Sequence, residues 1–219
     1  MRKLLLATLI ASMAFAQTIK NERGYFSSVG IGANFLKIEQ FGAGSTQEFE
    51  GVGLDLDLRV GALVKRQWAV TFDVVNSVKL EPDATVNGTV IPQNGLVFYQ
   101  GVGGPGLTYY FDNKELFYAG GTLGLAYFFK MNSNWDRSDK SKLGYGVLAR
   151  TGKDWRINPG MLIGVELNGG VTSAGVTIGN VAADYWAPNL RMLMNLKFGN
   201  RCVLSPEDTQ KYRDCMKGF

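Results

Sequence analysis

Two carboxylates, Asp55 and Asp57, have the spacing in this chain best suited to acid–base chemistry. At positions i and i+2 of an extended strand they project to the same face, where paired carboxylates can act as general acid and general base. The chain contains no histidine, which excludes Ser-His-Asp and Cys-His nucleophile systems and histidine-based metal centres. Nothing else supplies a nucleophile or a metal cage, so we expect no catalytic residue, no cofactor and no metal.

A glycine-rich motif, Gly101-Val102-Gly103-Gly104-Pro105-Gly106, matches the dinucleotide-binding pattern G-x-G-x-x-G. That chemistry requires a strand before the motif and a helix after it. Here residues 107–111 continue as a strand, so we interpret the glycines as places where a strand bends or lines a narrow interior.

The two aspartates lie in a segment that alternates strictly between apolar and polar or small residues. Over 51–64 every second residue is apolar, and Asp55, Asp57 and Arg59 occupy the positions between. Such a pattern predicts a strand with one apolar and one polar face. About 9–11 tilted residues are enough for a barrel strand to cross a bilayer.

The same period recurs in eight segments, which predict eight strands. They cover 24–38, 51–64, 68–80, 96–111, 116–130, 143–151, 155–168 and 185–198. Pro159 and Pro188 lack the donor that a ladder needs, so we expect a bulge or a frayed strand end at each.

The predicted connections alternate in length. Those at 65–67, 112–115 and 152–154 are tight, and those at 39–50, 81–95, 131–142 and 169–184 are long. This arrangement predicts an all-β, antiparallel up-and-down barrel with its long connections at one end, as in outer-membrane barrels.

The apolar face points outward, because the interior of an eight-stranded barrel is only wide enough for side chains. The apolar face carries Trp, Phe, Tyr, Leu and Met on every strand, whereas the other face is mostly Gly, Ala, Ser, Thr and charged residues. An outward apolar face of this size would be unusual on a soluble monomer. A lipocalin-like soluble barrel is the main alternative to a membrane barrel. The aromatic residues gather in two girdles, which a lipid-facing surface requires.

The first 16 residues read as a signal peptide, with Arg2 and Lys3 before an apolar run and Ala14-Phe15-Ala16 as the cleavage site. An uncleaved anchor is the alternative. The remainder, 17–199, suits a single barrel domain. The formal charge of +4 is too small and dispersed to indicate nucleic-acid binding.

The signal segment, the alternating strands and the aromatic girdles resemble the small outer-membrane β-barrels of Gram-negative bacteria, of the OmpA transmembrane-domain and OmpX type. The last strand resembles the assembly signal of that family: Leu196-Lys197-Phe198 matches its ending, whereas Leu193 replaces a usual glycine and Phe219 lies beyond the strand. The resemblance implies location in the outer membrane, with outer-membrane lipid and the barrel-assembly machinery as partners. Enzymes among these barrels use histidine, which this chain lacks, so we expect no enzymatic activity.

Nine charged residues fall on the predicted lumen face. Paired across a narrow interior they would fill it, because a buried charge needs a partner; alternatively, they would line a narrow path for ions. The nine are Asp55, Asp57, Arg59, Asp73, Arg150, Arg156, Glu166, Arg191 and Lys197.

The tail, 200–219, differs from the rest. Ser205, Pro206 and the acids after them are typical of a helix start. In an oxidising periplasm Cys202 and Cys215 are expected to form a disulfide that ties this helix to the barrel. Two free thiols, or bonds to another chain, are the alternatives.

These observations favour a structural barrel with a filled lumen, whose long external loops, including Trp135, serve an unknown surface or periplasmic partner. A narrow channel for ions or small solutes is the second hypothesis, and a soluble ligand-binding barrel the third.

Overall fold

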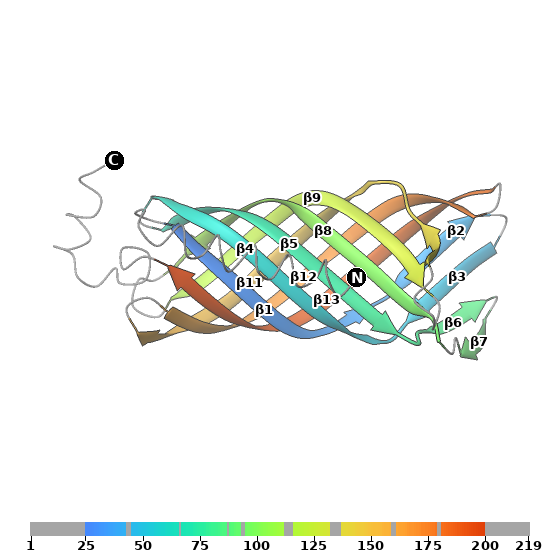
Figure 1. The fold of residues 1–219 in the computed structure, drawn as a ribbon, viewed down its shortest axis with the longest axis horizontal. Helices are drawn as coiled ribbons and strands as arrows, with labels where there is room; N and C mark the ends of the chain where they lie inside the picture. The colour runs from blue at the N-terminus through green and yellow to red at the C-terminus, as the bar shows by residue number, and fades with distance from the viewer. Residues whose placement is uncertain are drawn as a thin grey trace.

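The computed structural model describes residues 25–42, 45–65, 67–86, 88–92, 95–111, 116–131, 137–158, 161–178 and 181–199. Its elements are strands throughout (Figure 1). Among these residues, no helix is long and apolar enough to span a membrane. The predicted signal peptide, the tail helix and the Cys202–Cys215 disulfide lie outside the described residues.

Eight strands form a closed antiparallel barrel, which confirms the predicted architecture. Neighbours along the chain pair in turn, and β1 closes the barrel by pairing with β13 from Phe26–Gly199 to Leu36–Asn189. In order, the strands are β1 (Tyr25–Leu36), β4 (Val52–Lys65), β5 (Trp68–Leu80), β8 (Val97–Tyr110), β9 (Phe117–Met131), β11 (Gly144–Asn158), β12 (Met161–Ile178) and β13 (Val181–Gly199).

Side chains alternate between the wall and the lumen as the sequence predicts. On β5, Thr71 and Asp73 are buried, whereas Val70 and Phe72 are exposed on the outer face. The glycine-rich segment 101–106 lies inside β8 and pairs with β5 along its whole length. It is therefore part of a barrel strand, as we expected.

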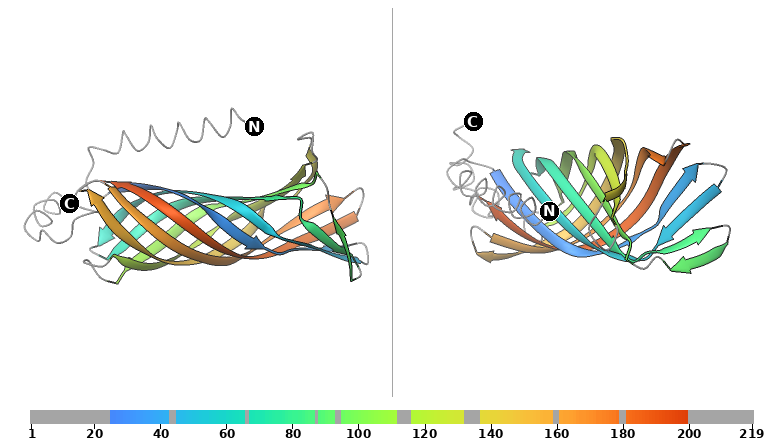
Figure 2. Two further views of the ribbon diagram at one scale, coloured as in Figure 1. Left: turned by 90° about the horizontal axis from the view of Figure 1, so that it is seen from below. Right: turned by 45° about the vertical axis from the view of Figure 1, so that its right-hand side comes forward.

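Five shorter strands extend the barrel at one end. They are β2 (Ile38–Gly42), β3 (Ser45–Glu50), β6 (Asp83–Val86), β7 (Thr89–Pro92) and β10 (Arg137–Lys140). The first four continue the sheet from β13 in the order β2, β3, β6, β7, and β10 pairs with β9. Three connections predicted to be long thus contain strands. We call this the extended end of the barrel (Figures 1 and 2).

Two predicted boundaries were wrong. The tight turn expected at 152–154 lies inside β11, and the connection expected at 169–184 is strand up to Ile178 and again from Val181. Small residues mask the alternation there: Thr172, Ala174 and Val176 are buried at every second position of β12, but they are too small to stand out beside the bulkier segments. The β12–β13 hairpin therefore reaches beyond the barrel wall at the extended end (Figure 1).

Candidate functional site: the lumen of the barrel

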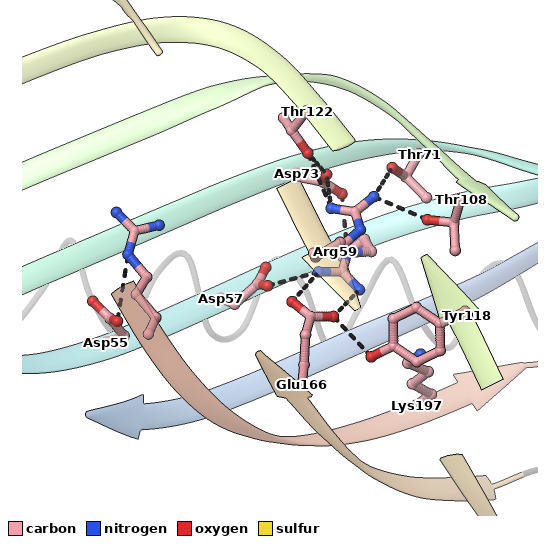
Figure 3. A network of polar contacts seen from close by, with 12 residues as sticks. Asp55, Asp57, Arg59, Thr71, Asp73, Thr108, Tyr118, Thr122, Glu166 and Lys197 are labelled. Atoms are coloured by element: carbon pink, nitrogen blue, oxygen red, sulfur yellow. Dashed lines mark hydrogen bonds and ion pairs between the residues drawn. The ribbon is translucent and has the colours of Figure 1, made fainter. Parts of the chain in front are cut away.

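Arg59 lies at the centre of the lumen, projecting inward from β4. Its Nη2 donates to Asp57 Oδ2 at 2.8 Å, and its Nε donates to Asp73 Oδ1 on β5 at 3.1 Å. Its two Nη atoms also donate to the two carboxylate oxygens of Glu166 on β12, at 3.0 and 3.1 Å. One guanidinium thus connects three carboxylates from three strands (Figure 3).

Arg150, on β11, is the second cation of this centre. Its Nη1 donates to Asp73 Oδ2 and to Thr122 Oγ1, and its Nη2 donates to Thr71 Oγ1 at 3.2 Å and Thr108 Oγ1 at 3.0 Å. Asp73 therefore binds both arginines, one with each oxygen.

We call the buried charged side chains around Arg59 the charged layer: Asp57, Arg59, Asp73, Arg150, Asp154, Glu166 and Lys197. Lys197 and Tyr118 lie at its side toward the short turns. The Lys197 amine donates to Asp154 Oδ2 at 2.7 Å and lies 3.9 Å from the centre of the Tyr118 ring. The Tyr118 hydroxyl donates to Glu166 Oε2 at 2.8 Å. Lys197 is thus linked through Tyr118 to the carboxylate that Arg59 holds (Figure 3).

Asp55 and Arg191 form a separate, looser pair. Asp55 Oδ1 accepts from Asn34 Nδ2 at 2.7 Å and from the Ser77 hydroxyl, and its Oδ2 lies 3.5 Å from Arg191 Nε. Neither Nη atom of Arg191 has a hydrogen-bond acceptor among the residues that the structure describes. The charged interior is therefore tightly bonded around Arg59 and less completely bonded around Arg191.

Burial makes these contacts energetically important. Arg59, Asp73 and Glu166 are at most 3% exposed, so each charge has lost its hydration and depends on its partners. Removing one partner of a buried ion pair typically costs about 3–5 kcal/mol, because the other charge is left uncompensated.

The structure places eight of the nine predicted lumen charges in the buried interior. The exception is Arg156, which is exposed near the end of β11. β11 continues to Asn158, so Arg156 is carried past the charged layer. Sequence reasoning missed Asp154, because it assigned that residue to a turn. It also missed Asn34 and Tyr118, since an interior amide or phenol carries no charge signal.

The lumen near the extended end is apolar, which differs from the polar interior that we expected. Phe98 contacts Phe49 at 5.5 Å, Tyr185 at 5.5 Å and Phe128 at 6.4 Å between ring centres. We call these four rings and the buried residues around them the aromatic cluster. The surrounding buried residues are Leu36, Ile38, Ala84, Ala174, Val176, Ala183 and Ala187.

Two lysines join the aromatic cluster to the β2–β3 hairpin. The Lys130 amine lies 4.6 Å from the centre of the Phe49 ring and donates to Gln40 Oε1 at 2.9 Å. The Lys79 amine donates to the main-chain oxygens of Leu36 and Phe49. These contacts hold Phe49 against Lys79 of β5, Phe98 of β8 and Lys130 of β9.

The outer wall carries a band of exposed apolar side chains. Ile31, Leu54, Leu123 and Met192 are each more than 60% exposed on four different strands. Aromatic side chains are exposed toward both ends of the band, with Trp68, Phe117 and Trp155 near the short turns and Phe35, Tyr145 and Trp186 toward the extended end. Within the described residues, no group of acidic or cysteine side chains is arranged to hold a metal ion.

This combination of a closed barrel, an apolar wall and a charged lumen is the fold of the small outer-membrane β-barrels. The structure is similar to OprG from Pseudomonas aeruginosa, with a TM-score of 0.53 and 17% identity over 83% of this chain and 99% of that chain. The outer membrane protein AlkL, whose structure was determined by solid-state NMR in DMPC bilayers, gives a TM-score of 0.50 and 14% identity over 81% and 90%.

The outer membrane protease OmpT from Escherichia coli is more distant, with a TM-score of 0.43 and 12% identity over 81% of this chain and 97% of that chain. No family model matches the chain, and no curated protein matches it in sequence. At these identities the likeness establishes the fold.

Proposed function

We propose that this chain is an outer-membrane β-barrel protein with a closed lumen, which serves as a structural scaffold for contacts at the cell surface. The observation that carries the proposal is the bonding of Arg59 to Glu166 across the lumen. Arg59 also binds Asp57 and Asp73, so the interior is crossed by bonded side chains from several strands. A rigid barrel of this kind presents its function on the connections that it carries.

The apolar band on the wall supports the membrane location. A surface with exposed Ile, Leu, Phe and Met on many strands would be poorly tolerated in water, whereas it matches the hydrocarbon core of a bilayer flanked by aromatic girdles. Outer-membrane lipid is then the first partner, and the assembly machinery that inserts barrels is the second.

The extended end supports the surface role. β2, β3, β6 and β7 continue the sheet beyond the barrel, and β7 lies at its edge. Val90 and Ile91 on β7 are exposed, and an edge strand offers unpaired backbone groups to another chain. We propose no catalytic activity, because the lumen carboxylates are engaged by arginine, lysine and hydroxyl groups.

A narrow channel is the second candidate, and Arg191 is the observation that favours it. Its Nη atoms meet no acceptor among the described residues, and a charge of this kind could contact a passing ion. The aromatic cluster and the Arg59 network oppose this function, since both lie across the same lumen.

The membrane location is tested by quenching of tryptophan fluorescence in vesicles. Trp68, Trp155 and Trp186 are exposed on the outer face, so lipids brominated on their acyl chains should quench them strongly in the refolded protein. Single Trp→Phe variants assign the signal to each girdle. Quenching no stronger than that of free tryptophan in solution would contradict the membrane location.

A further inference from the structure

A groove of about 720 Å³ lies on the outer wall at the base of the extended end. Its apolar side is formed by Phe35 of β1, Val52 of β4 and Leu190 of β13, which all belong to the exposed wall, and Val90 of β7 faces them. The β6–β7 hairpin thus overhangs the wall. The volume falls within the range of about 300–1,000 Å³ that is typical of ligand sites.

The groove exists because two neighbouring strands bend at the same level. Pro188 has no N–H to donate, and here β13 stops pairing with β1 at Leu36 and resumes with β2 at Glu39. The main-chain N–H of Lys37 bridges the break by donating to the main-chain oxygen of Pro188 at 3.3 Å. At the same level Gly51, between β3 and β4, has a φ of 150°, which non-glycine residues rarely adopt. The extension therefore tilts away from the barrel axis and leaves the groove open.

The rim of the groove is acidic. Glu50 and Asp83 line it together with Lys37. The Lys37 amine is already held by Glu39 at 3.0 Å, Glu48 at 3.1 Å and Glu50 at 3.7 Å. Hydrogen bonds to Glu39 and Glu48 raise the pKa of Lys37 above its ordinary value, so this amine remains charged and engaged.

One further amine lies close to the groove, on the lumen side of the wall. The Lys79 side chain packs against Gly51, where an added Cβ would lie 3.3 Å from Lys79 Cε. Its amine donates to the main-chain oxygens of Leu36 and Phe49. Four carboxylates therefore lie near two amines, and both amines are already bonded. The carboxylates are those of Glu39, Glu48, Glu50 and Asp83, and the amines are those of Lys37 and Lys79. The rim has negative charge in excess.

We propose that this groove binds a cationic amphiphile, with its apolar chain against Phe35, Val52 and Leu190 and its ammonium group at Glu50 and Asp83. The apolar side faces the bilayer, so a single chain can enter from the lipid. The carboxylates attract a positive head and repel a phosphate or sulfate. The site rests on the proposed function in one respect, because it needs the barrel to be embedded in a membrane.

The test compares three amphiphiles that share a dodecyl chain: dodecyltrimethylammonium, dodecyl sulfate and dodecyl maltoside. The chain without its predicted signal segment is refolded into phosphatidylcholine nanodiscs, and methyl NMR signals of Val52, Val90 and Leu190 are followed during titration. The ammonium compound should shift them at about tenfold lower concentration than the sulfate, as two nearby carboxylates would cause.

Matched variants separate charge from apolar contact. The double substitution Glu50→Gln and Asp83→Asn should abolish the preference for ammonium and leave the maltoside response unchanged. Leu190→Ala should weaken all three responses at Val52 and Val90. Met192→Ala, two residues along the same outer face of β13 and outside the groove, should have no effect.

Two outcomes overturn the inference. In one, ammonium and sulfate act at equal concentrations; in the other, the shifts are as large at Met192 as in the groove, as for ordinary lipid contact. Failure of the chain to enter nanodiscs would instead contradict the membrane location in the proposed function. A barrel that inserts and shows no preference contradicts the groove proposal alone.

Discussion

Arg59 and Glu166 face each other across the lumen and are joined by two hydrogen bonds of 3.0 and 3.1 Å. They lie 107 residues apart in the chain, on β4 and β12. These strands are not neighbours in the barrel, because β1 and β13 separate them. The pair therefore connects opposite parts of the wall and not adjacent strands.

Replacing Arg59 by methionine should lower the free energy of unfolding by about 3–5 kcal/mol, because Asp57, Asp73 and Glu166 lose their shared partner. The measurement is unfolding in denaturant in vesicles, followed by the gel shift of the folded barrel. The matched control is Arg156→Met, at an exposed position, which should change stability by less than about 1 kcal/mol, because exposed ion pairs contribute little. Equal effects of the two substitutions would contradict the account of the charged layer.

The Tyr118→Phe variant should be less stable by about 1–3 kcal/mol, since it removes the hydroxyl that donates to a buried carboxylate. The ring beneath the Lys197 amine is retained, so the loss reports the hydrogen bond to Glu166 alone. Tyr145→Phe, on the exposed outer face, serves as the control and should be neutral. A neutral Tyr118→Phe would mean that the hydroxyl does not hold Glu166 in place.

The aromatic cluster gives a third prediction. Truncating Phe98 to alanine should cost about 3–5 kcal/mol, because it opens a cavity among buried rings. Leu123→Ala, on the exposed face of β9, should cost clearly less. The refolded Phe98→Ala protein should still conduct no ions, because the charged layer around Arg59 is intact. Conductance in this variant would show that the aromatic cluster alone closes the lumen.

The tail gives a fourth prediction. Peptide mapping of the exported protein without reductant should recover Cys202 linked to Cys215. Such a bond typically adds about 2–4 kcal/mol of stability to the part that it closes. Thiols that can be alkylated without reduction would remove this prediction.

Alternation predicted the barrel because every strand has one face toward the wall and one toward the lumen. The clearest case is β4, which the structure confirms as a barrel strand. Its apolar residues Val52, Leu54 and Leu56 alternate with Gly53, Asp55 and Asp57. The boundaries of β11 and β12 were harder to predict, since small residues hide the period. Because those boundaries placed Asp154 in a turn, its position in the lumen was not predicted.

The aromatic cluster could not be read from the same pattern. Phe98 and Phe128 follow or precede other apolar residues, Val97 and Phe129, so both faces of these strand ends look apolar in the sequence. Their inward orientation depends on where the barrel ends and the β2–β3 hairpin begins. The partner choices of Arg59 and Arg150 likewise depend on strand stagger, which local sequence does not specify.

Single-channel recording in planar bilayers tests the closed lumen most directly. The chain without its signal segment would be refolded in detergent, checked by its gel shift on heating, and added to the bilayer. The account predicts a folded protein that gives no discrete current steps. Steady steps that change when Asp57 and Arg59 are both replaced by alanine would contradict it and would show a pore through the charged layer.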